Sequence, residues 1–142
     1  MRIANRVTLS LLLIAFSFSS AALGAGPAKN VETSPQAKVY RALLKAVQAG
    51  DFEGYKKCMT KEAAKGIDQQ TKEMGLDPKK GMEMMEAMTP TDLKLTSLKV
   101  EGKKATLEAT GKVDNELNKG TISLEQEDGQ WKVANQSWTN AK

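Results

Sequence analysis

The chain has 142 residues, of which 21 are lysine or arginine, 17 are aspartate or glutamate and none is histidine. The missing histidine excludes a Ser-His-Asp triad, a Cys-His pair and any histidine-ligated zinc or iron site. The lysines are scattered beside acids, with no basic stripe carrying interleaved aromatic residues, so nucleic-acid binding is not expected.

The first 24 residues have the pattern of a cleavable signal peptide. Arg2 and Arg6 precede the apolar run VTLSLLLIAFSF, which is short for a bilayer span, and small residues follow it. We expect cleavage after Gly24 or Ala25; an uncleaved membrane anchor is the alternative. No cysteine follows the small residues, so lipid attachment is not expected. The prediction is a periplasmic or secreted protein that does not associate with a membrane after cleavage.

The remaining length suits one domain, predicted over residues 34–140 after a flexible segment at 25–33. Cys58 is the single cysteine, so no intramolecular disulfide can form, and we interpret it as a small buried residue.

Helical patterns fill the first half of this domain. Ser34 and Pro35 are a favoured N-cap and first helical residue, and Gly50 ends the helix that they begin. Asp51 can cap a second helix over 52–59.

Further along, the pattern is more often interrupted by glycine. Thr60 can cap a short helix through residue 64, and a loose helix is expected near 67–74. A firmer helix is predicted over 78–88, ahead of Pro90.

After Pro90 the apolar period changes to two, which predicts strands. The alternation changes parity near Thr96-Ser97, which predicts a bulge. Turns are predicted at 101–102 and 128–129, and a longer loop at 114–120. The fold class is therefore α+β, with N-terminal helices packed on a curved, cone-shaped antiparallel sheet of about four strands.

Two segments carry a family resemblance: YRALLKAVQAGDFEGYKKCMTKEA at 40–63 and GTISLEQEDGQWKVANQSW at 120–138. They resemble the first two helices and the closing hairpin of the nuclear transport factor 2-like superfamily. Between them, GMEMMEAMTP and LKVEGKKATLEATGKV resemble a branch of small exported bacterial proteins. The resemblance spans most of residues 34–139 and implies a cystatin-like α+β cone with an apolar pocket, but no reaction.

The leading functional hypothesis is a non-enzymatic binding or accessory domain with a modest apolar pocket. No catalytic residue, cofactor or metal site is assigned. The expected partner is a small apolar ligand or another protein. The candidate pocket residues are Tyr40, Tyr55, Met84, Met88 and Trp131.

Two alternatives stay open. One is an isomerase or dehydratase that uses tyrosine and aspartate in an apolar pocket, although Asp51 is explained as a helix cap. The other is Cu(I) binding by thioethers, because Met82, Met84, Met85 and Met88 lie within seven residues of one another. The ordinary role of such methionines is to fill an irregular gap in the core.

The two tryptophans are seven residues apart, which puts them on opposite faces of a regular strand. Trp131 shares its phase with Val133 and is predicted to lie in the core. Trp138 is predicted on the outer face unless a bulge near Ala134-Asn135 turns the strand. We therefore expect Trp138, with Thr106 and Thr110, at a homodimer interface across the open face of the sheet.

Overall fold

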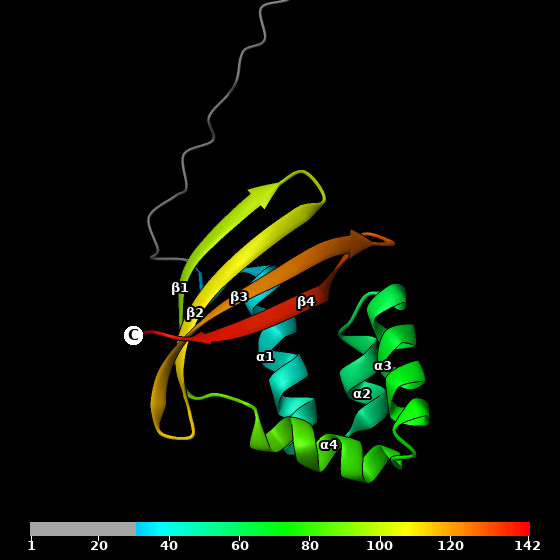
Figure 1. Ribbon diagram of the computed structural model, residues 1–142. Helices are drawn as coiled ribbons and strands as arrows, with labels where there is room; N and C mark the ends of the chain where they lie inside the picture. Colours follow the sequence, from blue (N-terminus) through cyan, green and yellow to red (C-terminus); the bar gives the residue numbers. More distant parts are fainter. Residues whose placement is uncertain (1–30) are drawn as a thin grey trace, which may run out of the picture.

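The structure is a computed structural model that describes residues 31–142, so the predicted signal peptide and residues 25–30 lie outside it. Within the described residues, four helices precede a four-stranded antiparallel sheet of order β1-β2-β3-β4 (Figure 1). This confirms the predicted α+β class. The elements are α1 Pro35–Gln48, α2 Phe52–Lys57, α3 Lys61–Glu73, α4 Pro78–Ala87, β1 Thr91–Glu101, β2 Lys104–Val113, β3 Glu116–Glu127 and β4 Gln130–Asn140.

Every helix begins at a side chain that caps it. The side-chain oxygens of Ser34, Asp51, Thr60 and Asp77 each accept a hydrogen bond from a backbone N–H in the first turn of the helix that follows. These caps satisfy amide groups that would otherwise have no partner. At the other end of α1, Gly50 adopts a φ of 66°, a left-handed conformation that glycine tolerates.

Helix α3 is longer than the sequence pattern predicts. The expected segments at 61–64 and 67–74 are one continuous helix that passes through Gly66. A glycine inside a helix costs only about 1 kcal/mol relative to alanine, so it does not by itself end the helix. Ala63, Ile67 and Met74 stay on one face across the glycine, which favours continuation.

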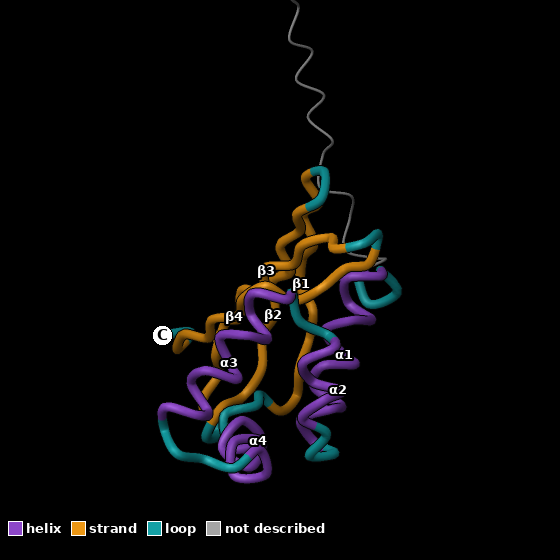
Figure 2. Tube along the Cα trace, turned by 90° about the vertical axis from the view of Figure 1, so that its right-hand side faces the viewer, coloured by secondary structure: helices purple, strands orange, loops and turns teal. Residues whose placement is uncertain are grey.

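The helices lie around one face and one edge of the sheet. In Figure 1, α1 lies behind the sheet, and α4 runs across its lower end toward α2 and α3, beyond the edge strand β4. Figure 2, turned by 90°, shows α1 and α2 on one side of the strands and α4 below them. Helix α3 contacts the sheet through β4.

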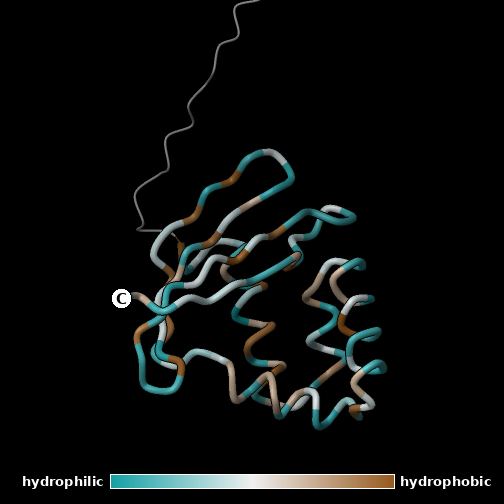
Figure 3. The backbone as a smooth tube through the Cα atoms, viewed as in Figure 1, coloured by the Kyte–Doolittle hydropathy of each residue, from teal (hydrophilic) through white to brown (hydrophobic). Residues whose placement is uncertain are grey.

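The core fills the space between α1 and the inner face of the sheet. Hydrophilic residues dominate the tips of the hairpins, whereas hydrophobic residues recur along the strands and helices (Figure 3). The fully or almost fully buried residues come from both layers: Ala37, Tyr40, Leu43, Val47, Tyr55, Met82, Ala105, Leu107, Ala109, Ile122, Leu124 and Val133. Val31, which precedes α1, is also buried, whereas Glu32 and Thr33 are exposed.

The pairing of the described sheet is irregular at three places: between Thr91 and Lys94, between Leu95 and Ser97, and opposite Ser123 and Leu124. Leu95 pairs with Ala109 and Ser97 with Glu108, which leaves Thr96 as the extra residue and confirms the predicted bulge in β1. In β4, Asn135 pairs with Ser123 but Val133 pairs with Leu124, so Ala134 is the extra residue. A residue added at a bulge reverses the facing of all residues beyond it.

A short edge contact lies at the second bulge. The Thr60 N–H donates to the Val133 carbonyl at 2.9 Å, and the Val133 N–H donates to the Cys58 carbonyl at 2.8 Å. This pairing attaches the α2–α3 connection to the edge of β4. It also covers the strand edge with another part of the chain.

One turn is tighter than predicted. The expected loop at 114–120 is a two-residue turn at Asp114 and Asn115, with φ values of 51° and 64°, and β3 already begins at Glu116. Aspartate and asparagine tolerate the left-handed conformation that such hairpin turns require. Within residues 31–142, no helix combines the length and the apolar character needed to cross a bilayer.

Candidate functional site

A groove of about 540 Å³ lies between α3, α4 and β4. A volume of this size is typical of small-molecule sites. Although 27% of the chain is charged, none of the residues that line the groove is. They are Leu43, Tyr55, Met59, Ala63, Gly66, Ile67, Gln70, Thr71, Met74, Leu76, Gly81, Met84, Met85, Met88, Val133, Ala134, Asn135 and Gln136.

A second cavity of about 380 Å³ adjoins the first and extends from it toward Trp138. Its lining is also without charge. Both cavities are lined by the same five residues, Leu43, Tyr55, Met85, Met88 and Gln136, which therefore mark the junction between them.

The groove is lined by more methionines than the cluster at residues 82–88 supplies. Met84, Met85 and Met88 of the cluster line it, and Met59 and Met74 join them from more distant positions. Met82, the fourth member of the cluster, is 1% exposed and belongs to the core. Met84 and Met88 are 46% and 63% exposed, so their flexible side chains can adapt to a bound molecule.

Gln136, a polar residue at the junction, is hydrogen-bonded to a tyrosine of the core. The hydroxyl of the fully buried Tyr40 donates to Gln136 Oε1 at 2.9 Å. Burial raises the pKa of Tyr40 to about 12, and the neighbouring Trp138 indole acts in the opposite direction. The Trp138 Nε1–H is buried but has no hydrogen-bond partner of acceptable geometry in the described chain. Burial also raises the pKa of Tyr55.

The structure brings three of the five predicted pocket residues together. Tyr55, Met84 and Met88 line the groove. Tyr40 lies beneath it and reaches it only through Gln136. Trp131 lines neither cavity; it is half-buried against the core and pairs with Gln126 near the β3–β4 turn.

Gln136 was missed because regular alternation places it on the outer face, with Lys132. The bulge at Ala134 moves it to the inner face, where it pairs with the buried Ile122. One indication of this bulge was present in the sequence, the odd spacing of the two tryptophans. Two tryptophans seven residues apart can lie on the same face of a strand only if a bulge lies between them.

The outer-face prediction for Trp138 is corrected by the same bulge. A Cβ atom added at Gly120 would lie 2.6 Å from Cζ2 of Trp138, and one added at Gly111 would lie 3.6 Å from its Cζ3. Both glycines are in phase with buried residues of β2 and β3, so the indole packs on the inner face. Thr106 and Thr110 lie on the opposite face, and the three residues do not form one surface.

The tyrosine-aspartate arrangement is not assembled. The Asp51 side chain accepts from the Gly54 N–H at 2.8 Å, as a helix cap. Asp68 is exposed and lies 3.0 Å from Lys56 Nζ. No acid of residues 31–142 lines either cavity, and these residues contain no group of three or more acids or cysteines placed to hold a metal ion. Cys58 is half-buried, and burial raises its pKa.

No protein-family model matches the chain, and no curated protein matches its sequence. The fold is similar to a SEC-C motif-containing protein from Rhodopseudomonas palustris, with a TM-score of 0.50 and 14% identity over 70% of this chain and 74% of that one. A function-unknown protein from Mycobacterium tuberculosis gives a TM-score of 0.48 and 16% identity over 79% of this chain and 73% of that one.

These comparisons correct the predicted nuclear transport factor 2-like membership, which they do not support. The motifs behind the prediction are a helix break and a hairpin turn. Capping and turn chemistry produce both in unrelated chains, so they carry little family information. At 14% identity, the first likeness shows the fold alone.

Proposed function

We propose that the protein is an exported, non-enzymatic binding module whose ligand site is the uncharged groove between α3, α4 and β4. The observation that carries this proposal is the complete absence of charged side chains from the groove, in a chain of which 27% of the residues are charged. Apolar walls with a few polar groups are typical of small-molecule sites. Export is proposed from the pattern of the first 24 residues.

The test places a charge in the groove without disturbing the core. Met84 lines the groove and is 46% exposed, so Met84→Lys is expected to fold. Leu117 lies on β3 and is 56% exposed, away from both cavities, so Leu117→Lys is a matched control. We expect the uncharged dye Nile red to bind the unchanged protein and the Leu117→Lys variant equally.

The Met84→Lys variant should bind the dye at least about tenfold more weakly, because an unpaired charge in an apolar site is unfavourable. Equal binding by all three proteins would place the dye elsewhere and contradict the proposal. Native mass spectrometry of protein purified from its own host then identifies any retained ligand.

Methionine-based Cu(I) binding is the second candidate, favoured by one observation: five methionines line one groove. Soft thioether sulfurs select Cu(I). Replacing both Met84 and Met88 by leucine removes two sulfurs but keeps the groove apolar. Competition against a Cu(I)-specific chelator separates the candidates, since loss of metal affinity with unchanged Nile red binding would favour the copper site.

A further inference from the structure

The inner end of the groove carries hydrogen-bond donors that the protein itself does not use. The Tyr40 hydroxyl donates to Gln136 Oε1 at 2.9 Å, which leaves the Nε2 end of this amide for another partner. Within residues 31–142, neither the Gln136 amide nitrogen nor the Tyr55 hydroxyl makes a hydrogen bond. Both residues line both cavities, so both belong to the junction between them.

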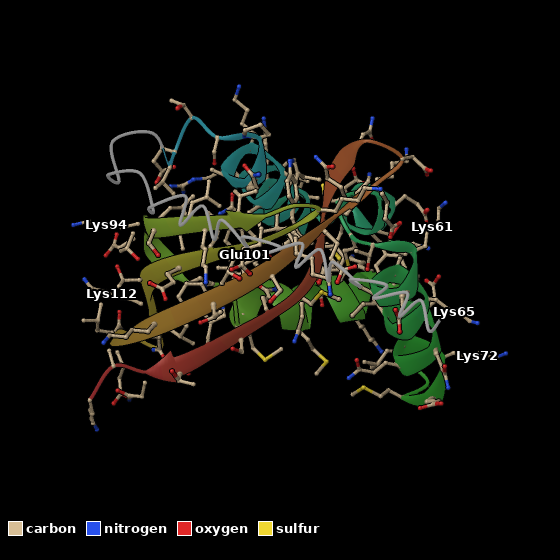
Figure 4. All side chains as sticks on the ribbon, turned by 90° about the horizontal axis from the view of Figure 1, so that it is seen from above. Lys61, Lys65, Lys72, Lys94, Glu101 and Lys112 are labelled. Atoms are coloured by element: carbon tan, nitrogen blue, oxygen red, sulfur yellow. The ribbon has the colours of Figure 1, made fainter. Side chains whose placement is uncertain are left out.

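The charged side chains of the helices that form the groove do not line it. Figure 4 shows Lys61, Lys65 and Lys72 of α3 pointing outward, away from the rest of the molecule. The opposite face of α3 contributes Ala63, Ile67 and other uncharged residues to the groove. A ligand carboxylate would therefore find no cation in the lining, and a ligand ammonium would find no acid.

From this arrangement, and resting on the proposed binding function, we propose that the groove takes an uncharged amphiphile with a linear hydrocarbon tail and a carbonyl head group. The tail lies along the methionines of the larger cavity, whose flexible side chains adapt to its shape. The carbonyl oxygen lies at the junction and accepts hydrogen bonds from Gln136 Nε2 and the Tyr55 hydroxyl. The chemical class is a neutral acyl ester or amide.

The experiment compares three probes that share a tail and differ in the head group: glycerol monodecanoate, the decanoate anion and decyltrimethylammonium. Each displaces Nile red from the full mature chain at neutral pH, below its micelle concentration. We expect the ester to bind at least about tenfold more tightly than either ion. This comparison requires no substitution and therefore does not depend on whether a variant folds.

Variants then test the donors. Gln136→Leu keeps the size of the side chain but removes the amide, and Tyr55→Phe removes the hydroxyl. Each should weaken ester binding about three- to tenfold while leaving Nile red binding within about twofold. Gln130→Leu, on β4 but outside both cavities, is the matched control and should change neither.

The outcomes separate the inference from the proposed function. If Nile red binds but decanoate competes as well as the ester, or if Gln136→Leu leaves ester binding unchanged, the inference is wrong and the binding function stands. If neither dye nor amphiphile enters the groove, both are wrong. A stable dimer that excludes every probe would assign the groove to a second copy of the chain and would also overturn the inference.

Discussion

At the scale of single residues, Gly120 is needed because the Trp138 indole covers it. A Cβ at this position would lie 2.6 Å from Cζ2 and 2.7 Å from Cη2 of the ring, closer than carbon atoms pack. Gly120 is paired directly with Trp138 in the β3–β4 ladder, so the backbone has little freedom to relieve the overlap. The glycine therefore lets the indole lie flat on the sheet.

Gly120→Ala should lower the free energy of unfolding by about 1–3 kcal/mol, the usual penalty for overpacking. Urea denaturation measures this change. In a Trp138→Leu background the same substitution should have a much smaller effect, because the ring that it meets is gone. Equal effects in both backgrounds would contradict the close packing of residue 120 on the indole.

At the scale of elements, the sequence predicted what depends on local chemistry. The caps at Ser34, Asp51 and Thr60 and the bulge near Thr96 were confirmed, because side-chain hydrogen bonds and the alternation of apolar residues can be recognised within a few residues. The order of helices before strands, and with it the fold class, followed from the same signals.

What the sequence did not predict depends on contacts between distant segments. The bulge at Ala134 lies where residues 58–60 pair with Val133, a contact between segments more than 70 residues apart in the chain. No local pattern specifies such a pairing. Gln136 and Trp138 were assigned to the wrong face for this reason, and the donor end of the groove was missed with them.

Helix α3 provides the prediction at this scale. None of its residues is buried, so its stability depends on propensity and capping more than on packing. A Cβ at Gly66 would meet no atom within 4 Å. Gly66→Ala should stabilise the helix by about 0.5–1 kcal/mol, which slows amide hydrogen exchange in α3 roughly two- to fivefold. Unchanged or faster exchange in residues 61–73 would contradict this prediction.

At the scale of the whole molecule, stability at high pH depends on two tyrosine hydroxyls, one in the core and one at the groove. The chain has two tyrosines, Tyr40 and Tyr55, which are 0% and 4% exposed. Burial raises the pKa of Tyr40 to about 12 and also raises that of Tyr55. An unfolded tyrosine has a pKa of about 10, so the folded state holds both phenolic protons more tightly than the unfolded state. Their contribution to stability is complete below about pH 10 and is lost as the pH rises toward 12.

We therefore expect the ultraviolet absorbance of tyrosinate to stay absent up to about pH 10 and then to appear together with the loss of secondary structure in circular dichroism. Tyr40→Phe removes one of the two ionisations that favour the unfolded chain at high pH. The free energy of unfolding of this variant should fall less steeply with pH above about 10, even though the hydrogen bond to Gln136 is lost. If both tyrosines form tyrosinate near pH 10 in a chain that keeps its secondary structure, the Tyr40 hydroxyl reaches water and this prediction is wrong.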